Sequence, residues 1–437
     1  MIITMALLLS VLLVSNVHVN TVQAYSQEGG IINSNTAWTK SNGPYTLTGP
    51  VGIAEGATLT IEPGVTINLG PYTLEVNGSL IAQGTPTDKI VFNSDAQNMQ
   101  PALNINLPYG NPTCKIENAV LYRTTILAQS YYSNASVSIN NCSFEGNAGI
   151  NIWGSTTISN SYITGGVSLR GSSVVSNSKM LNGIDISGSY TLSGNTITNL
   201  QGIWVIDAGE AGSSTLTGKI IDNIIYGGGT AGINLAAPAT IQGNLIIDNQ
   251  IGISIRSKQD NSLISHNMIT GNQVGVRTPT SATVISNNNI GNNTDYNLSV
   301  GNVAVDVTNN WWGTTDTSVI DNKILDNSDD FNLGKVNYAP FLTAPDSQAP
   351  SNTYIPIATP SPSSTAPSTS PTNGQNFSAS PDQSGPQTVA FLGLDWMQIA
   401  TLALLVVIAV LLVIVVVFLR KKRKINPIQI GSSLIFS

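Results

Sequence analysis

The hexapeptide ISHNMI, residues 264–269, follows a pattern that recurs through most of the chain: apolar, two variable residues, small polar, one variable residue, apolar. Seven further segments share it: ISNSYI at 158, VSNSKM at 175, LSGNTI at 192, IIDNII at 220, IQGNLI at 241, ISNNNI at 285 and VTNNWW at 307. Looser copies, IENAVL at 116 and INNCSF at 139, extend the series toward the N-terminus. The chain therefore repeats one structural unit of roughly twenty residues.

A second pattern recurs between the hexapeptides, in which glycine is followed by a β-branched residue and then by alternation. Its copies are GINI at 149, GVSL at 166, GIDI at 183, GIWV at 202, GINL at 232, GISI at 252 and GVRT at 275. Two short strands per period are typical of a solenoid whose coils stack at about 4.8 Å. The composition agrees, because 40 glycines and only 9% charged residues suit turns and strands rather than an α/β core.

The fourth position of the hexapeptide predicts an internal ladder. It holds Cys142, Ser161 and Ser178 and then only asparagine: Asn195, Asn223, Asn244, Asn267, Asn288 and Asn310. Asparagine tolerates a left-handed turn, and stacked amides hydrogen-bond along a solenoid axis. We therefore expect the left-handed turn and the amide ladder to coincide at this position.

His266 raises the question of a metal site, because Met268 lies two residues on and the chain has only one other histidine. His266 occupies the third hexapeptide position, where other copies carry Asn, Asp or Gly, a set typical of a polar turn facing solvent. Met268 shares its position with Tyr, Lys, Thr, Ile and Leu, none of which forms a ligand series. The pattern favours a turn residue over a metal ligand.

Three segments carry a resemblance to a known family: LTIEPGVTI at 59, LEVNGSLIAQGTPTDKIVFNS at 74 and NNWWGTTDTSVIDNKILDNSDDFNLGKVNYAPFL at 309. With the asparagine series, they resemble the right-handed parallel β-helix repeat proteins of archaea and bacteria, over about residues 36–343. This pectate-lyase-like superfamily includes polysaccharide lyases, polygalacturonases, surface adhesins and the periplasmic protein that helps to load copper into nitrous oxide reductase. The resemblance implies an all-β, right-handed, single-stranded parallel β-helix, here of about 11 to 12 coils.

The two ends of the chain predict a membrane-anchored surface protein. The apolar run near the N-terminus, ending in VQA, is typical of a signal peptide, and a charge-free run of 23 residues before RKKRK is typical of a stop-transfer helix. The expected organisation is signal peptide 1–24, N-terminal cap 25–58, β-helix 59–315, C-terminal cap 316–343, Pro/Ser/Thr-rich disordered stalk 344–390, transmembrane helix 397–419 and cytoplasmic tail 420–437. The body would then lie outside the cell.

Charge and cysteine content limit the partners. The net charge is −7 and no basic patch precedes the C-terminal end, so no nucleic-acid partner is expected. Cys114 and Cys142 fall in separate buried positions, so we expect no disulfide, although an extracellular one is chemically permitted. Six sequons are candidate glycosylation sites: Asn77, Asn134, Asn141, Asn292, Asn297 and Asn376.

The sequence supplies no complete catalytic motif. A glycosidase on this scaffold needs carboxylates stacked on one outer face, and the repeats show no such pair. The nearest approach to a lyase site is Asp185 beside Arg170, which is also the pattern of a surface ion pair on adjacent coils. DNSDD at 326 is a weak candidate for calcium because it lacks the turn glycine and distal glutamate of a calcium loop. No other cofactor or metal is indicated, and the missing motifs favour a protein that is not an enzyme without deciding the question.

The strands that begin with glycine predict a binding surface. Their outward positions include Asn151, Trp153, Arg170, Asn234 and Arg256, and by the same alignment Trp204. Tryptophan among amides and guanidinium groups suits a saccharide, although either tryptophan could instead lie beneath a long loop. We expect non-catalytic binding of a glycan or another cell-envelope component. A polysaccharide lyase or glycoside hydrolase is the alternative, and copper assembly is a more distant one.

Overall fold

A computed structural model describes residues 26–94, 103–105, 113–128, 136–199, 204–208, 218–256, 261–278 and 280–352. All of them belong to one compact unit spanning residues 1–362. The expected signal peptide 1–24, transmembrane helix 397–419 and tail 420–437 lie outside the described residues, as does the expected stalk beyond residue 352. Within the described residues, no helix has the length and apolarity needed to cross a membrane.

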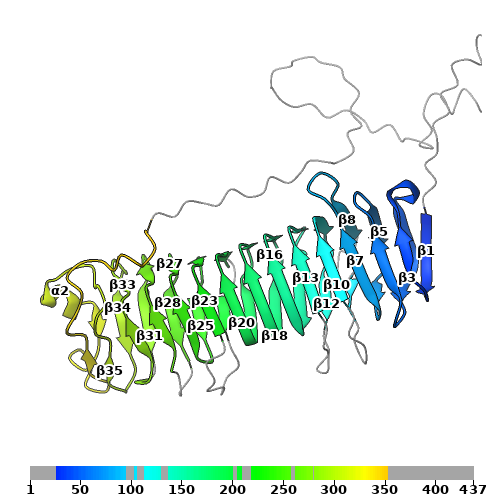
Figure 1. Cartoon of the computed structure of the whole chain (residues 1–437). Coiled ribbons are helices and arrows are strands. Elements are labelled where there is room, and N and C mark those ends of the chain that lie inside the picture. Colours follow the sequence, from blue (N-terminus) through cyan, green and yellow to red (C-terminus); the bar gives the residue numbers. More distant parts are fainter. Residues whose placement is uncertain are drawn as a thin grey trace, which may run out of the picture. The chain divides into compact units, whose positions relative to one another are not determined.

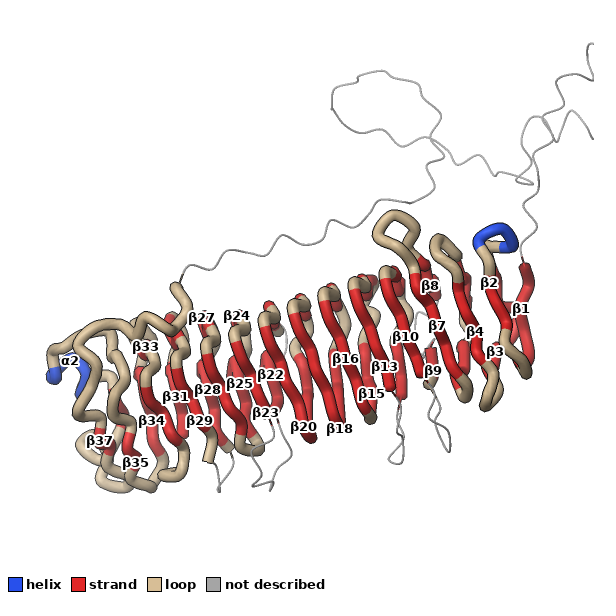
Figure 2. The backbone as a smooth tube through the Cα atoms, viewed as in Figure 1, coloured by secondary structure: helices blue, strands red, loops and turns tan. Residues whose placement is uncertain are grey.

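The described chain is a parallel β-helix: 35 strands form one coiled sheet, and every pair of these strands is parallel (Figures 1 and 2). The sheet has three faces, which we number in the order set by the hexapeptide. Face 1 consists of β2 (Thr36–Trp38), β4 (Thr58–Ile61), β7 (Ser79–Gln83), β10 (Thr113–Glu117), β13 (Ser136–Asn140), β16 (Ser155–Ser159), the second halves of β18 (Val167–Ser176) and β20 (Ile184–Ser193), β23 (Gly218–Ile221), β26 (Ala239–Gln242), β29 (Leu263–Ser265) and β32 (Val284–Ser286).

Faces 2 and 3 complete each coil. Face 2 consists of the first halves of β1 (Ser26–Ile32) and β3 (Tyr45–Ile53), then β5 (Thr66–Gly70), β8 (Ile90–Ser94), β11 (Ala119–Tyr122), β14 (Ser143–Glu145), β17 (Tyr162–Ile163), β19 (Lys179–Met180), β21 (Thr196–Thr198), β24 (Ile224–Tyr226), β27 (Leu245–Ile247), β30 (Met268–Thr270) and β33 (Asn289–Ile290). Face 3 consists of the second halves of β1 and β3, β6 (Leu74–Val76), β9 (Leu103–Asn104), β12 (Ile126–Ala128), β15 (Ile150–Trp153), the first halves of β18 and β20, β22 (Trp204–Ala208), β25 (Ala231–Leu235), β28 (Ile251–Ile255), β31 (Val274–Thr278), β34 (Tyr296–Val300) and β36 (Ile324–Leu325).

The core is a set of apolar columns that run along the coil axis. On face 1, Ile116, Ile139, Ile158, Val175 and Leu192 follow one another in register and are fully buried. Burial of each such side chain contributes roughly 1.5–3 kcal/mol relative to exposure. The first position of the hexapeptide thus faces the interior, as the pattern predicts. The right-handed sense of the coil remains a prediction from the preference of parallel crossovers.

The corner between faces 1 and 2 corrects one expectation. The left-handed residue is the third of each hexapeptide, one place before the ladder. Ten such residues have φ between 48° and 66°: Asn118, Asn141, Asn160, Asn177, Gly194, Asp222, Gly243, His266, Asn287 and Asn309. Asn, Asp, Gly and His are the residues that tolerate this region best. The third position therefore makes the turn, which leaves the fourth free to point inward.

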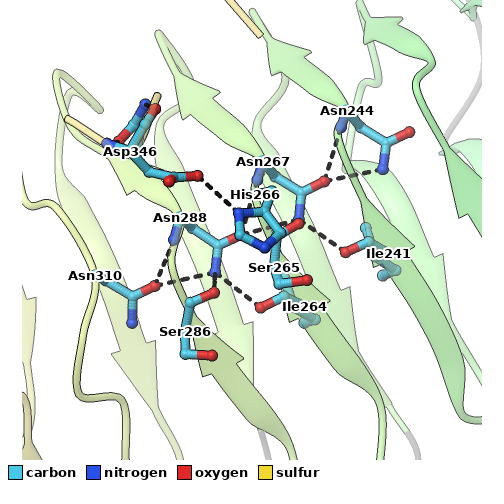
Figure 3. A network of polar contacts seen from close by, with 11 residues as sticks. Ile241, Asn244, Ile264, Ser265, His266, Asn267, Ser286, Asn288, Asn310 and Asp346 are labelled. Carbon is cyan, nitrogen blue, oxygen red and sulfur yellow. Dashed lines mark hydrogen bonds and ion pairs between the residues drawn. The ribbon is translucent and has the colours of Figure 1, made fainter. Parts of the chain in front are cut away.

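The fourth position forms a continuous ladder of buried amides (Figure 3). From Asn223 onward, each asparagine Oδ1 accepts two hydrogen bonds from the preceding coil: for Asn267, from the backbone N and the Nδ2 of Asn244, both at 2.9 Å. Asn288 receives the same pair of bonds from Asn267, and Asn310 from Asn288, at 2.9–3.0 Å. Toward the N-terminus, the hydroxyl groups of Ser161 and Ser178 take over as acceptors. The ladder thus satisfies the backbone N–H groups of the corner.

A second ladder lies at the corner between faces 2 and 3, and the sequence patterns did not reveal it. Asn249 donates to Oδ1 of Asn272, and Asn272 to Oδ1 of Asn293, each through N and Nδ2 at 3.0–3.1 Å. Asn293 donates in turn to Oδ1 of Asn297 at 3.0 Å. A left-handed residue precedes each of the first three: Asp248, Gly271 and Asn292. At both corners, therefore, the turn consists of a left-handed residue followed by a buried asparagine.

The two ends of the solenoid differ in structure. At the C-terminal end, β35 (Val305–Asp306) pairs with β37 (Val336–Asn337), and the short helix α2 (Thr317–Asp321) precedes β36. Trp312 is buried there and meets the ring of Tyr338 edge to face. At the N-terminal end, the 3-10 helix η1 (Lys40–Asn42) follows Trp38, which stacks on Tyr45 inside the first full coil. Within the expected N-terminal cap 25–58, β1 and β2 pair with β3 and β4 as strands of the solenoid.

Candidate glycan-binding face

The centre of the candidate site is a cluster on the outer side of face 3, built by β15, β18 and β20. Register aligns Asn151 with Ser168 and Asp185, and Trp153 with Arg170. The Arg170 guanidinium lies 5.3 Å from the centre of the Trp153 ring and its Nη2 lies 3.8 Å from Oδ2 of Asp185. The Ser168 hydroxyl donates to the same oxygen at 3.4 Å. Three adjacent coils thus hold an aromatic ring, a cation and a carboxylate in contact.

This cluster is accessible to a ligand from solvent. The Arg170 and Asp185 side chains are 45% and 47% exposed, so their ion pair contributes little to stability, about 0–1 kcal/mol. The cation–π contact places the guanidinium group over the indole and covers part of it. Oδ1 of Asn151 is buried from solvent without a hydrogen-bond partner. The patch thus offers hydrogen-bond donors and an acceptor for the hydroxyl groups of a saccharide, and an aromatic surface for the C–H groups of its ring.

Trp204 does not belong to the same column as Trp153, which corrects the sequence alignment. β22 pairs Ile206 with Ile184 and Asp207 with Asp185, so the coil aligns VIDA, not GIWV, with GIDI. Trp204 lies opposite Ala231 instead. Relative to the column of Asp185, Trp153 is two positions later and Trp204 three positions earlier, a shift of about 16 Å along the strands at ~3.3 Å per residue. The Trp204 side chain itself lies outside the described part of the chain.

Asn234 is also corrected, because it is 1% exposed and cannot meet a ligand on the outer face. All residues from 231 to 239 are buried, so this coil is covered on both sides of the sheet. Arg256, in contrast, is exposed just after β28, on the same face. The structure therefore brings Asn151, Trp153 and Arg170 together with Asp185, and separates Asn234 from them by burial.

The register also reveals a stacked pair of acidic positions that the sequence alignment missed. Asp185 and Asp207 are direct partners on adjacent strands, and Asn234 follows in the same column. Neighbouring strands are about 4.8 Å apart. Asp185 and Asp207 thus share one column in the backbone register, while the Asp207 side chain lies outside the described part of the chain.

His266 lies beside the ladder in Figure 3 and contacts the returning C-terminal segment. Its Nδ1 is 2.8 Å from Oδ2 of Asp346, and the two side chains are 19% and 13% exposed. The Asn289 side chain accepts from the Asp346 backbone N at 2.7 Å and donates to its O at 3.1 Å. We name these contacts the Asp346 clasp. His266 is thus half-buried against Asp346 rather than open to solvent, and Asp346 belongs to the segment expected as stalk.

The candidate calcium loop is organised by its own hydrogen bonds. Oδ1 of Asp326 accepts from the Ser328 backbone N and hydroxyl, and Oδ2 accepts from the backbone N of Val336. Burial alone would raise the pKa of Asp326, but these hydrogen bonds outweigh it and hold the pKa below its usual value. Among the residues described, no three His, Cys, Asp or Glu side chains form a group suited to a metal ion.

The sequons differ in accessibility. Asn292 is exposed at a left-handed turn, and Asn77 is half-buried. Asn141 donates from Nδ2 to Oδ1 of Asn118 at 2.6 Å. Asn297 is 3% exposed and closes the second ladder, so the folded protein cannot carry a glycan there, which corrects that prediction. Asn134 and Asn376 lie outside the described residues.

Both cysteines are free thiols in the interior. Burial, followed by the proximity of Cys142, raises the pKa of Cys114 to about 12, and burial raises the pKa of Cys142 to about 12. The Cys142 thiol lies 3.2 Å from the carbonyl O of Asn140. Neither thiol is therefore set up as a nucleophile or as a thiolate ligand.

Comparisons with known proteins give partial likenesses. No protein-family model matches the chain. The protein bark beetle of Drosophila melanogaster is 44% identical over 70 residues, which is 16% of this chain and only 2% of that protein's length. The crystal structure of the periplasmic alginate epimerase AlgG is 12% identical with a TM-score of 0.43, and covers 71% of this chain and 82% of that one. A double mutant of AlgG gives 13% identity and a TM-score of 0.34 over the same shares. The identification of this chain as a parallel β-helix therefore follows from its own strand register.

Proposed function

We propose that this protein is a membrane-anchored, extracellular β-helix that binds a glycan or another saccharide component of the cell envelope without chemically changing it. The observation that carries the proposal is the contact of Trp153, Arg170 and Asp185 on three adjacent, rigid strands. Rigid strands lower the entropic cost of binding because the side chains are already arranged. The anchor and the extracellular location rest on the two terminal apolar runs of the sequence.

The chemistry of the cluster indicates how a saccharide would bind. A bound sugar would move the Arg170 side chain aside from the indole. The C–H groups of the sugar ring would then contact the ring of Trp153. The Asp185 carboxylate would then accept hydrogen bonds from hydroxyl groups of the sugar, and the Ser168 hydroxyl would donate one to them. Each of these hydrogen bonds replaces one to water, so most of the selectivity would come from their combined geometry.

The test is binding of the full-length protein, in detergent or nanodiscs, to an array of polysaccharides, followed by titration of each hit. Arg170→Ala and Trp153→Ala should each weaken binding at least tenfold, about 1.4 kcal/mol. Arg123→Ala is the matched control, because Arg123 lies 5.2 Å above the ring of Tyr122 in the same kind of contact elsewhere on the surface. Equal losses in all three variants, or in none, would refute this site.

A polysaccharide lyase or glycoside hydrolase is the second candidate, favoured by the register of Asp185 with Asp207. Two acidic positions one strand apart could provide an acid and a nucleophile or base. The same binding experiment therefore includes assays for new reducing ends and unsaturated products, with and without calcium. Turnover by the wild-type chain that Asp185→Asn abolishes, with binding retained, would establish catalysis. Binding with no new chain ends would reject it.

A further inference from the structure

The outer side of face 2 changes character along the solenoid. From β14 to β21, its outward side chains are polar or charged apart from the ring of Tyr162: Ser143, Glu145, Lys179, Thr196 and Thr198. On β24, β27 and β30, its outward side chains are apolar or aromatic apart from Thr270: Ile224, Tyr226, Leu245, Ile247 and Met268. We name these last five residues the face 2 patch.

The face 2 patch is continuous. Register pairs Ile224 with Leu245, Leu245 with Met268, and Tyr226 with Ile247. Leu245 at the centre is 3% exposed, and the other four side chains are half-buried. The residues between them are fully buried in the core, so these three strands are apolar on both sides. Parallel strands with continuous apolar sequences are usually covered on both sides, which predicts a further segment over the patch.

The returning C-terminal segment reaches the edge of this patch. The Asn289 side chain holds Asp346, and Asn289 lies on the outer side of β33, directly after Met268 in register. Figure 1 shows this segment running back along the solenoid from its C-terminal end. Ala349 and Pro350 are half-buried, and the described residues end two positions later. The chain therefore leaves the described structure close to the face 2 patch.

The sequence that continues from this point is apolar. Residues 353–358 read TYIPIA, whereas residues 359–376 contain no aromatic residue and no Ile, Leu, Val or Met. The reach of the chain is also sufficient. Three strand spacings separate Asn289 from Ile224, about 14 Å at ~4.8 Å each. The eight residues from Asp346 to Tyr354 span up to about 26 Å at ~3.3 Å per residue, which leaves room for the turn at 347–348.

We propose that the face 2 patch binds residues 353–358 of the same chain, so that Tyr354, Ile355 and Ile357 are removed from water together with the patch. The Asp346 clasp fixes the start of this segment beside its site. A segment tethered through so short a linker has an effective concentration on the order of millimolar, with which a second copy or a partner protein would have to compete. The site is independent of the glycan-binding cluster, which lies on the outer side of face 3.

Chymotrypsin cleavage of the full-length protein in detergent tests the proposal. Cleavage after Tyr354 should be at least tenfold slower than cleavage after Phe377, which serves as the reference within the same chain. The double variant Ile224→Glu with Met268→Glu should remove most of that difference. Leu263→Glu is the control, because it replaces an apolar side chain that is 41% exposed on face 1. Equal cleavage at the two sites in the wild type, or slow cleavage after Tyr354 that persists in the double variant, would overturn the proposal.

Labelling of a thiol in the patch is the second measurement, and it spares the charges of the first. Ile247→Cys should react slowly with a maleimide, and adding Ile355→Asp and Ile357→Asp should accelerate the reaction at least tenfold. Leu263→Cys should react rapidly in both backgrounds, and the two native cysteines are buried. Rapid labelling of Ile247→Cys before the aspartates are added would overturn the proposal, since the patch would then be uncovered. Slow labelling that the aspartates leave unchanged would also overturn it, since another segment or a partner would then cover the patch.

Discussion

Replacing Asn267 by alanine tests whether the amide ladder holds the coils together. Oδ1 of Asn267 accepts two hydrogen bonds from Asn244, and its Nδ2 donates to the carbonyl groups of Ile241 and Ser265 and to Oδ1 of Asn288, all at 2.9 Å. Alanine removes all five contacts from a site that is fully buried. The backbone N–H of Asn244 is then left without an acceptor, because water cannot reach it.

The magnitude follows from these contacts. One buried N–H without a partner costs about 1–3 kcal/mol, and the weakened carbonyl groups and the small void add to it. We expect a loss of roughly 3–5 kcal/mol, concentrated in the two coils that meet at Asn267. Asn267→Asp keeps the volume but sets an acceptor against three acceptor oxygens, so it should be at least as harmful as alanine.

Hydrogen exchange is the appropriate assay because a solenoid can open one coil at a time. The amide of Asn244 should lose most of its protection in both variants, and urea unfolding should begin at a lower concentration. Asn302→Ala, at an exposed position outside both ladders, is the control and should stay within about 0.5 kcal/mol of wild type. A cost below about 1 kcal/mol for Asn267→Ala, with the Asn244 amide still protected, would refute the reasoning.

Three further outcomes are expected. Thr156→Val should be neutral or slightly stabilising in thermal unfolding, because the buried Thr156 hydroxyl has no partner; a clear loss of stability would indicate a bound water. Cys114 and Cys142 should resist alkylation at pH 8 in the folded protein and react only after denaturation, as mass spectrometry would show; rapid native labelling would contradict their raised pKa values. The pKa of Asp326 is lowered in the folded state, so its contribution is present above the ordinary value of 3.8 and is lost as pH falls below it. Acid unfolding monitored by tryptophan fluorescence should therefore depend less on pH in Asp326→Asn, and an unchanged profile would contradict this.

The hexapeptide repeat was sufficient to predict the fold because each copy supplies both an apolar residue of a buried column and the polar residues of a corner. Ile116, Ile139 and Ile158 align as the pattern requires. The assignment of the turn was off by one residue, since asparagine serves both for left-handed φ and for the ladder, and composition cannot separate the two roles. The second ladder could have been found from DNQIG at 248 and GNQVG at 271, which repeat the left-handed residue followed by asparagine.

The candidate site was predicted only in part, because the alignment of strands in successive coils depends on the lengths of the loops that connect them. Trp153 and Arg170 lie 17 residues apart in two regular coils, and simple spacing placed them together correctly. At the next irregular coil, GIWV resembled the glycine pattern more closely than VIDA did, so Trp204 took the place of Asp207. Burial of Asn234 could not be anticipated, since parity gives the side of the strand but not what covers it. The contact of Asp346 with His266 joins positions 80 residues apart, and no local pattern encodes it.

The Asp346 clasp determines how mechanical load would enter the molecule. A pull on the chain beyond residue 352 is resisted at Asp346 by the paired hydrogen bonds to Asn289 and by the contact with His266. Tension is thus passed to Asn289 of β33 and to His266, at the corner between β29 and β30, and not only to the closing turns at residues 301–342. A solenoid pulled from its last turn would peel one coil after another. In this solenoid the pulled segment is attached several strands before the last turn, at Asn289 and His266. The last turn therefore carries less of the force and should unwind later.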